Sequence, residues 1–194
     1  MSDKIEYIEL RFPDLLGRLK AMIVPCKPVD DLKALAMDPV MKKGSSCDGS
    51  SVTGLASVEA SDLRLDPDVS TLIELPLADR RTAAVMCFIR EKAATGTTDE
   101  YFPLDTRGRL HTVCTEYLPG KLQLKVKVEP EFHFITPDGE PFDDAGYADT
   151  YPRSPGMDVL LDIASGITDI GMIPKVIHHE HGEAQQEIEL DFED

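Results

Sequence analysis

Cysteines and basic residues are scarce in this 194-residue sequence. The four cysteines, at positions 26, 47, 87 and 114, are widely spaced and include no C-x-x-C pair, which argues against a zinc site or a disulfide framework. The 20 Lys and Arg residues are outnumbered by 36 Asp and Glu residues. This acidity excludes nucleic acid as an expected partner, because phosphate binding needs clustered positive charge.

Long apolar runs are also lacking. The longest run is far shorter than a membrane span, and Met1–Lys4 does not begin like a signal peptide, so we expect no membrane partner and a cytoplasmic location. With 42% hydrophobic and 29% charged residues, the chain is expected to fold into one globular domain or two small ones.

The first half of the sequence has the pattern of a small mixed sheet with one helix. We expect this helix to begin near Pro28 and to end where prolines and glycines follow from Pro39, before a polar loop over residues 44–51. These features indicate a ubiquitin-like β-grasp domain over residues 1–95, next to a Thr- and Gly-rich loop at 91–103. The predicted strands are residues 4–12 and 18–25, joined as a hairpin, 63–65, 71–75, and 83–90, which is buried on both faces.

Residues 103–194 predict a second, α+β unit. One helix is expected from Asp105 to near Gly120, with Leu110, Val113, Cys114, Tyr117 and Leu118 on one stripe. A second helix is expected to begin with Ser154 as N-cap and Pro155 at its first position, and to end at Gly171. Its predicted buried residues are Val159 or Leu160, Ile163, Ile167 and Ile170. The predicted strands are residues 122–134, 172–177 and 187–190, with a turn at 137–141.

The last two strands are predicted to form a hairpin that brings carboxylates together. If Gly182 pairs with Gln185 in the turn, Glu180 lies opposite Glu187, and His178 lies opposite Glu189. Opposed residues are about 5 Å apart at their Cβ atoms, where two like charges are destabilising. A positive charge is therefore expected between the two glutamates.

A further pair of carboxylates comes from the alternating segment 122–134, in which Glu129 and Glu131 share a face. Together the two segments could hold Mg²⁺ or Mn²⁺, which prefer oxygen ligands. The alternative is that these side chains form the solvated face of a sheet in a chain that has many glutamates.

Four motifs, in order along nearly the whole chain, resemble those of glutamine synthetases. Residues 7–20 resemble the amino-terminal hairpin of that family, and Asp48-Gly49-Ser50-Ser51 with residues 60–68 resembles its ammonium-site loop and the next strand. Glu129-Pro130-Glu131-Phe132, and His178-His179-Glu180 followed by Gln185 and Glu187, resemble its two metal-binding strands. The resemblance implies an amino-terminal β-grasp domain followed by part of a glutamine synthetase-type catalytic domain, an antiparallel sheet with helices.

The resemblance also implies a reaction, in which ATP phosphorylates the γ-carboxylate of glutamate and ammonia then displaces the phosphate. Glu131, Glu180 and Glu187 would hold a first Mg²⁺ or Mn²⁺, and Glu129 would be one ligand of a second. The alternative for each of the four is a surface carboxylate.

The remaining implied roles concern ammonium and the orientation of the glutamates. Asp48 would accept a proton from ammonium, in the active site of a neighbouring subunit. Tyr147 would line the ammonium pocket or pack in its loop. His178 and His179 would orient the glutamates, and the alternative for His178 is a bond to Glu189 or to solvent.

Some residues depart from the family pattern. Lys127 stands where the family usually has glycine, Ala184 also replaces a glycine, and Cys47 replaces an aromatic residue. Moreover, the sequence stops soon after Leu190, where the catalytic domain of the family is only beginning. We therefore expect this chain alone to be incomplete and inactive, with ATP bound only if the missing part is supplied.

Three interpretations remain open at this point, and with them the question of whether the chain is an enzyme. It is part of a glutamate–ammonia ligase, as a homo-oligomer or with a glutamine synthetase-type partner chain, and glutamate and ammonium are its substrates. Alternatively, it is a non-catalytic metal-binding or regulatory protein that assembles with itself or with a full-length synthetase. In the third interpretation, the β-grasp domain mediates ring assembly and the glutamates are vestigial.

Overall fold

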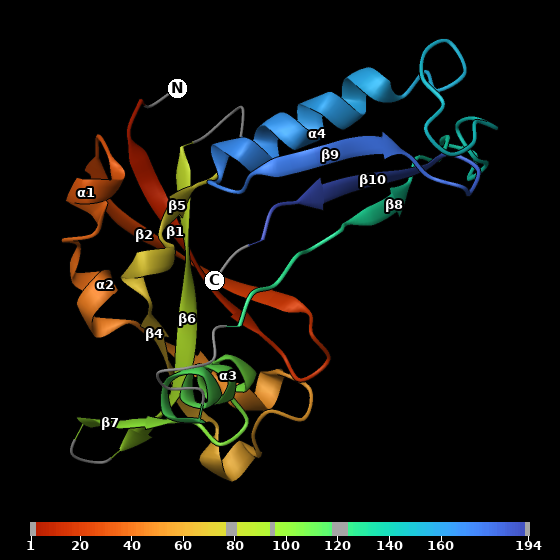
Figure 1. Cartoon of the computed structure of the whole chain (residues 1–194). Coiled ribbons are helices and arrows are strands. Elements are labelled where there is room, and N and C mark those ends of the chain that lie inside the picture. The colour runs from red at the N-terminus through yellow and green to blue at the C-terminus, as the bar shows by residue number, and fades with distance from the viewer. Residues whose placement is uncertain (1–2, 77–80, 94–95, 118–123, 193–194) are drawn as a thin grey trace. The chain divides into compact units, whose positions relative to one another are not determined.

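The structure is a computed structural model that describes residues 3–76, 81–93, 96–117 and 124–192 (Figure 1). The chain divides into two compact units, Met1–Leu122 and Gln123–Asp194, and each is described by itself. Among the described residues, no helix is both long enough and apolar enough to cross a membrane.

The first unit is built on a mixed sheet, in which the described residues form seven strands. The strand order is β2-β1-β6-β4-β3, and β5 and β7 also pair with β6. Only the pairing of β1 with β6 is parallel among these. The strands are β1 (Ile5–Pro13), β2 (Leu19–Val29), β3 (Ser45–Asp48), β4 (Asp62–Pro67), β5 (Ile73–Glu74), β6 (Thr82–Ala93) and β7 (Gly96–Tyr101).

The predicted hairpin and the buried strand of this unit are confirmed. In the β1–β2 turn, Oδ1 of Asp14 accepts hydrogen bonds from the backbone N–H groups of Leu16 and Arg18 at 2.9 and 2.8 Å. The bond from Arg18 is the main reason why the pKa of Asp14 lies below its ordinary value. Strand β6 is buried on both faces, with Ala84 and Val85 both 1% exposed.

The predicted single helix from Pro28 is wrong. Strand β2 continues to Val29, and two short helices follow, α1 (Leu32–Leu35) and α2 (Pro39–Lys43). The side chains of Asp31 and Asp38 cap these helices by accepting from Ala34 N and Val40 N. Pro39 begins α2 because a missing N–H group is tolerated in the first turn of a helix.

Two predicted loops of this unit contain strands instead. The polar segment 44–51 includes β3, in which buried Cys47 pairs with Leu63 of β4, and then a 3₁₀ turn, Gly49–Ser51. The segment 91–103 includes the end of β6 and all of β7, which form a hairpin. The strand predicted at 71–75 is limited to β5, after a 3₁₀ turn at Val69–Thr71. Cross-strand pairing therefore overrides the loop-like composition at 44–51 and 91–103.

Helix α3 (Thr106–Thr112) begins at the predicted place and continues as a π-helical turn over Val113–Tyr117. Buried Asp105 is its N-cap and also accepts a hydrogen bond from Ile89 N of β6 at 2.9 Å, which ties the helix to the first sheet. Burial raises the pKa of this carboxyl group. The predicted stripe residues Leu110, Val113 and Cys114 are exposed, and Leu118 and Gly120 lie outside the described residues.

The second unit contains a three-stranded antiparallel sheet of order β8-β10-β9. Helix α4 lies along β9 in Figure 1, and its buried residues Leu160 and Ala164 pack with Ile188 and Leu190 of β10. Because side chains alternate along a strand, Glu187 and Glu189 project to the other face of the sheet. The elements are β8 (Glu131–His133), α4 (Met157–Asp169), β9 (Pro174–His179) and β10 (Gln185–Leu190).

The observed elements of this unit differ in their bounds from the predicted ones, with β9 and β10 each displaced or extended by two residues. Helix α4 begins at Met157 after Gly156, so Ser154 is not its N-cap, and Ala164 is buried in place of Ile163. The strand predicted at 122–134 is reduced to β8 because Pro130 has no N–H group to donate to the sheet. The carbonyl oxygen of Pro130 still accepts from Ile188 N at 3.1 Å. The turn predicted at 137–141 is confirmed by a bond from Gly139 N to Thr136 O at 2.9 Å.

Candidate functional site

The β9–β10 hairpin determines which charged side chains meet. Its turn closes as predicted, with Gln185 N donating to Gly182 O at 3.0 Å, and Ala184 takes a left-handed conformation with φ 53°. However, Glu180 N also donates to the carbonyl oxygen of Gln185, at 2.7 Å, so Gln185 is bonded to both Glu180 and Gly182. The predicted register is therefore wrong by two residues. The residue opposite Glu187 is His178, and Glu189 lies opposite Val176.

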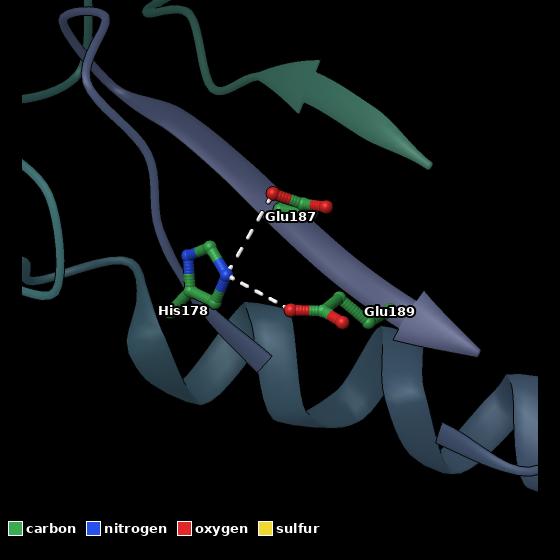
Figure 2. A group of neighbouring side chains, drawn as sticks. All are labelled: His178, Glu187 and Glu189. Carbon is green, nitrogen blue, oxygen red and sulfur yellow. Dashed lines mark ion pairs between the residues drawn. The ribbon is translucent and has the colours of Figure 1, made fainter. Parts of the chain in front are cut away.

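A row of three functional side chains crosses this sheet. Glu187 of β10 pairs with His178 of β9 on one side and with Glu131 of β8 on the other. Figure 2 shows Glu187 and Glu189 directed toward the His178 ring. The Nε2 atom of His178 lies 3.6 Å from an oxygen of each of these glutamates, and its Nδ1 atom lies 3.5 Å from Oε1 of Glu180.

Glu180 and Glu187 interact with each other. The side chains are mostly buried, with 17% and 10% of their surfaces exposed. Burial, followed by the contact with Glu180, raises the pKa of Glu187, whereas the N–H group of His181 lowers the pKa of Glu180. The shifts are opposite because burial disfavours the charged form of Glu187, whereas the N–H group of His181 favours the charged form of Glu180. A divalent cation between these two carboxylates would offset the cost of a negative charge on Glu187, so the donor set fits Mg²⁺ or Mn²⁺.

The other two predicted metal ligands have protein partners. Glu131 is exposed and accepts a hydrogen bond from Nε2 of Gln185 at 2.6 Å. Glu129 forms an ion pair of 2.5 Å with Lys127, and Lys127 also pairs with Glu189. Among the described residues, the group whose possible metal-binding atoms all lie within 4.8 Å of one another is His178, Glu187 and Glu189. Of the four predicted metal ligands, the structure thus brings Glu180 and Glu187 together, whereas Glu129 forms an ion pair with Lys127.

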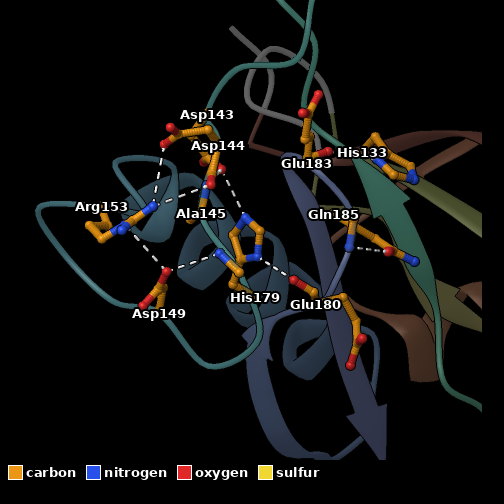
Figure 3. Close-up of polar contacts among 12 residues, drawn as sticks. His133, Asp143, Asp144, Ala145, Asp149, Arg153, His179, Glu180, Glu183 and Gln185 are labelled. Atoms are coloured by element: carbon orange, nitrogen blue, oxygen red, sulfur yellow. Dashed lines mark hydrogen bonds and ion pairs between the residues drawn. The ribbon is translucent and has the colours of Figure 1, made fainter.

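The surface of the second unit that carries Glu129, Glu131, Glu180, Glu187 and Glu189 is called the acidic face below. His179 projects away from it and is fully buried. Its Nε2 atom lies 2.8 Å from Oδ1 of Asp143, and its Nδ1 atom lies 2.6 Å from the carbonyl oxygen of Glu180 (Figure 3). Both ring nitrogens of His179 therefore lie within hydrogen-bonding distance of oxygen atoms. His179 thus touches the backbone of Glu180 but not its carboxylate.

Tyr147 lies beside the acidic face. Its loop is held by a bond of 2.9 Å from Ala148 N to the carbonyl oxygen of His179. The Tyr147 ring packs edge-on against His178, with centroids 5.1 Å apart, and stacks on His181 at 5.2 Å. His181, for which no role was predicted, is therefore part of an aromatic cluster with Tyr147 and His178.

Asp48 belongs to the first unit, at the end of β3. Its exposed carboxylate accepts hydrogen bonds from Oγ of Ser50 at 2.7 Å and Oγ of Ser51 at 2.9 Å, and from Ser50 N. These bonds, first that of the Ser50 side chain, lower its pKa. The carboxylate is consequently ionised at neutral pH and suited to binding a cation.

Glu189 was predicted only as a partner of His178, although the spacing Glu187-Ile188-Glu189 places two carboxylates on one face of a strand. Two further residues that contribute to this region, Lys127 and Asp143, were not predicted as part of it. Lys127 was recognisable only as a departure from the family pattern. No signal marks Asp143, which is 36 residues from His179 in the sequence.

Comparisons with known proteins bear on both units. The family model for the β-grasp domain of glutamine synthetase matches residues 4–92, and that for the glutamine synthetase catalytic domain matches residues 93–194. The chain belongs to the glutamine synthetase family. The predicted resemblance and the predicted α+β fold, with an amino-terminal β-grasp domain, are thereby confirmed.

Individual relatives cover the whole chain. The glutamine synthetase of Methanococcus maripaludis is 32% identical over 202 residues, and that of Pyrococcus furiosus is 31% identical over 197. Both alignments include 100% of this chain but only 44% and 41% of those enzymes. The solved structure of a GmaS/ADP complex aligns with a TM-score of 0.79 and 26% identity, over 98% of this chain and 42% of that one. This chain thus spans less than half the length of each of these three proteins.

Proposed function

We propose that this member of the glutamine synthetase family forms part of a cytoplasmic, oligomeric ligase. The ligase joins ammonia to the γ-carboxylate of glutamate through γ-glutamyl phosphate, with ATP as phosphoryl donor. The observation that carries the proposal is the Glu180–Glu187 pair, two largely buried carboxylates that interact with each other and both contact His178. Such a pair is costly without a cation or proton between its members.

The residues of the acidic face have distinct proposed roles. Glu180, Glu187 and Glu131 hold Mg²⁺ or Mn²⁺, which when bound neutralises charge that develops on the transferred phosphoryl group. His178 contacts Glu180 and Glu187 and fixes their orientation. His179 helps to position Glu180 through the hydrogen bond between its Nδ1 atom and the carbonyl oxygen of Glu180.

Asp48 and Tyr147 are proposed to serve ammonium. The lowered pKa of Asp48 keeps its carboxylate charged, so it attracts ammonium and is available to accept a proton from it. Tyr147 presents an aromatic ring next to His178, and such rings attract cations. By family resemblance, Asp48 serves the site of a neighbouring subunit, so a homo-oligomer or an assembly with another glutamine synthetase-type chain is proposed.

Binding of Mn²⁺ tests the metal site. Isothermal titration should show Mn²⁺ binding by the chain and its loss in a Glu131→Ala, Glu187→Ala double variant. A Glu183→Ala variant, which removes an exposed carboxylate from the same hairpin, should bind like the unchanged chain. Equal affinity in the chain and the double variant would contradict the proposed role of these glutamates.

A second candidate is a non-catalytic metal-binding or regulatory protein that assembles with itself or with a full-length synthetase. The ion pair of Lys127 with Glu129 favours it, because Glu129 corresponds to a ligand of the second metal of the family. For the chain alone we expect no γ-glutamyl hydroxamate from glutamate, ATP, Mn²⁺ and hydroxylamine. Turnover above background in a pure sample would refute that expectation, and a ring-sized native mass would support assembly with itself.

A further inference from the structure

A lysine is built into the acidic face of the second unit. The ammonium group of Lys127 lies between Oε1 of Glu129, at 2.5 Å, and Oε2 of Glu189 on β10. Only 23% of the Lys127 side chain is exposed. Lys127 precedes β8, so residues from two separate segments of the chain converge on its nitrogen.

This arrangement disagrees with a second divalent cation on Glu129. A protonated lysine has no lone pair to offer a metal, and its charge repels another cation nearby. Its two hydrogen bonds also occupy oxygens of both Glu129 and Glu189. A metal ion that used Glu129 would first have to displace the ammonium group.

We propose that Lys127 is a fixed counter-charge that takes the place of a cation between Glu129 and Glu189. The acidic face then has two halves, with His178 at their border because its Nε2 atom contacts both Glu187 and Glu189. In one half, Glu180 and Glu187 are free of lysine and available to a divalent ion. In the other half the positive charge is that of Lys127. The acidic face therefore binds one divalent ion fewer than it would without this lysine.

The ionisation of the groups agrees with this arrangement. The hydrogen bond to Glu129, followed by that to Glu189, raises the pKa of Lys127 above its ordinary value. The same contact with Lys127 lowers the pKa of Glu189.

The test is a count of bound Mn²⁺ per chain from the free-ion signal in electron paramagnetic resonance. Lys127→Met, which removes the charge but preserves the length of the side chain, should bind about one more ion than the unchanged chain. Lys127→Arg should show no gain, because it retains the charge. Lys175→Met is the matched control, since Lys175 forms an ion pair of 3.3 Å with Asp191 and contacts neither Glu129 nor Glu189.

The difference between variants decides the inference, whatever the absolute count. A gain in Lys127→Met that disappears when Glu189→Gln is added supports it. Equal counts in the chain and in Lys127→Met overturn it, and so does an equal gain in Lys175→Met. If Lys127→Met does not fold, Lys127→Gln provides the same comparison. The inference rests on the proposed function only for the first ion, the one at Glu180 and Glu187. If the unchanged chain binds no Mn²⁺ while Lys127→Met binds one ion, the proposed site at Glu180 and Glu187 is contradicted and the role of Lys127 is supported.

Discussion

The change Glu187→Gln should affect the metal-free and the metal-bound protein in opposite directions. Glu187 is a buried residue that pairs with Glu131 and His178 on its two sides and contacts Glu180. Without metal, the change removes the cost of ionising a carboxyl group whose charged form is disfavoured by burial and by Glu180. The melting temperature of the metal-free variant should therefore equal or exceed that of the unchanged chain.

With Mn²⁺ the order should reverse. At a concentration 100 times its Kd, a ligand adds about 2.7 kcal/mol to the free energy of unfolding. For a chain of this size that corresponds to a rise of about 5–11 °C in the melting temperature. If the variant binds Mn²⁺ 100-fold more weakly, the same concentration adds only about 0.4 kcal/mol, or about 1–2 °C.

Thermal melts followed by circular dichroism at pH 7.5, with and without Mn²⁺, measure both effects. Glu183→Gln is the control, because Glu183 is an exposed carboxylate in the same hairpin. It should keep the full Mn²⁺ response. A Mn²⁺ response of the same size in Glu187→Gln and in the unchanged chain would refute the reasoning, as would a metal-free variant that melts several degrees lower.

Two further predictions concern pH and the buried histidine. Burial and Glu180 raise the pKa of Glu187 in the folded chain. Protonated Glu187 therefore adds to the free energy of unfolding of the metal-free chain. This addition is complete below the ordinary pKa of a glutamate and is lost as the pH rises through the raised pKa. Mn²⁺ must displace that proton, so the Mn²⁺-induced rise in melting temperature should shrink on acidification, and a pH-independent rise would contradict this. His179→Leu should lower the free energy of unfolding in urea by about 3–5 kcal/mol, because it leaves the carboxylate of Asp143 buried and unpaired. Arg153→Leu, which breaks exposed ion pairs, should lower it by less than about 1 kcal/mol, and equal losses in the two variants would contradict a special role for His179.

Much of the site's chemistry was predictable because it depends on local pattern. The alternation of Glu187, Ile188 and Glu189 determines which side chains share a face, and this survives a register shift of two residues. The turn from Gly182 to Gln185 was likewise predictable. The family motifs identified Glu180 and Glu187, which the structure brings together.

The helices and strands that were predicted wrongly depend on contacts with residues far away in the sequence. The polar segment 44–51 became a strand because Cys47 could be buried opposite Leu63 of β4. Helix α4 buries Ala164 in place of Ile163, because the contact with β10 selects the helix face. Composition within a short window contains no information about such partners.

The sequence by itself determined the family, the alternating strands and the presence of an acidic face. Only the tertiary structure decided that His178 lies opposite Glu187, that Lys127 reaches Glu189 62 residues away, and that His179 binds Asp143. The reason is that side-chain direction follows from the period of a strand, which is local, whereas register and ion pairing depend on which distant segment the strand meets.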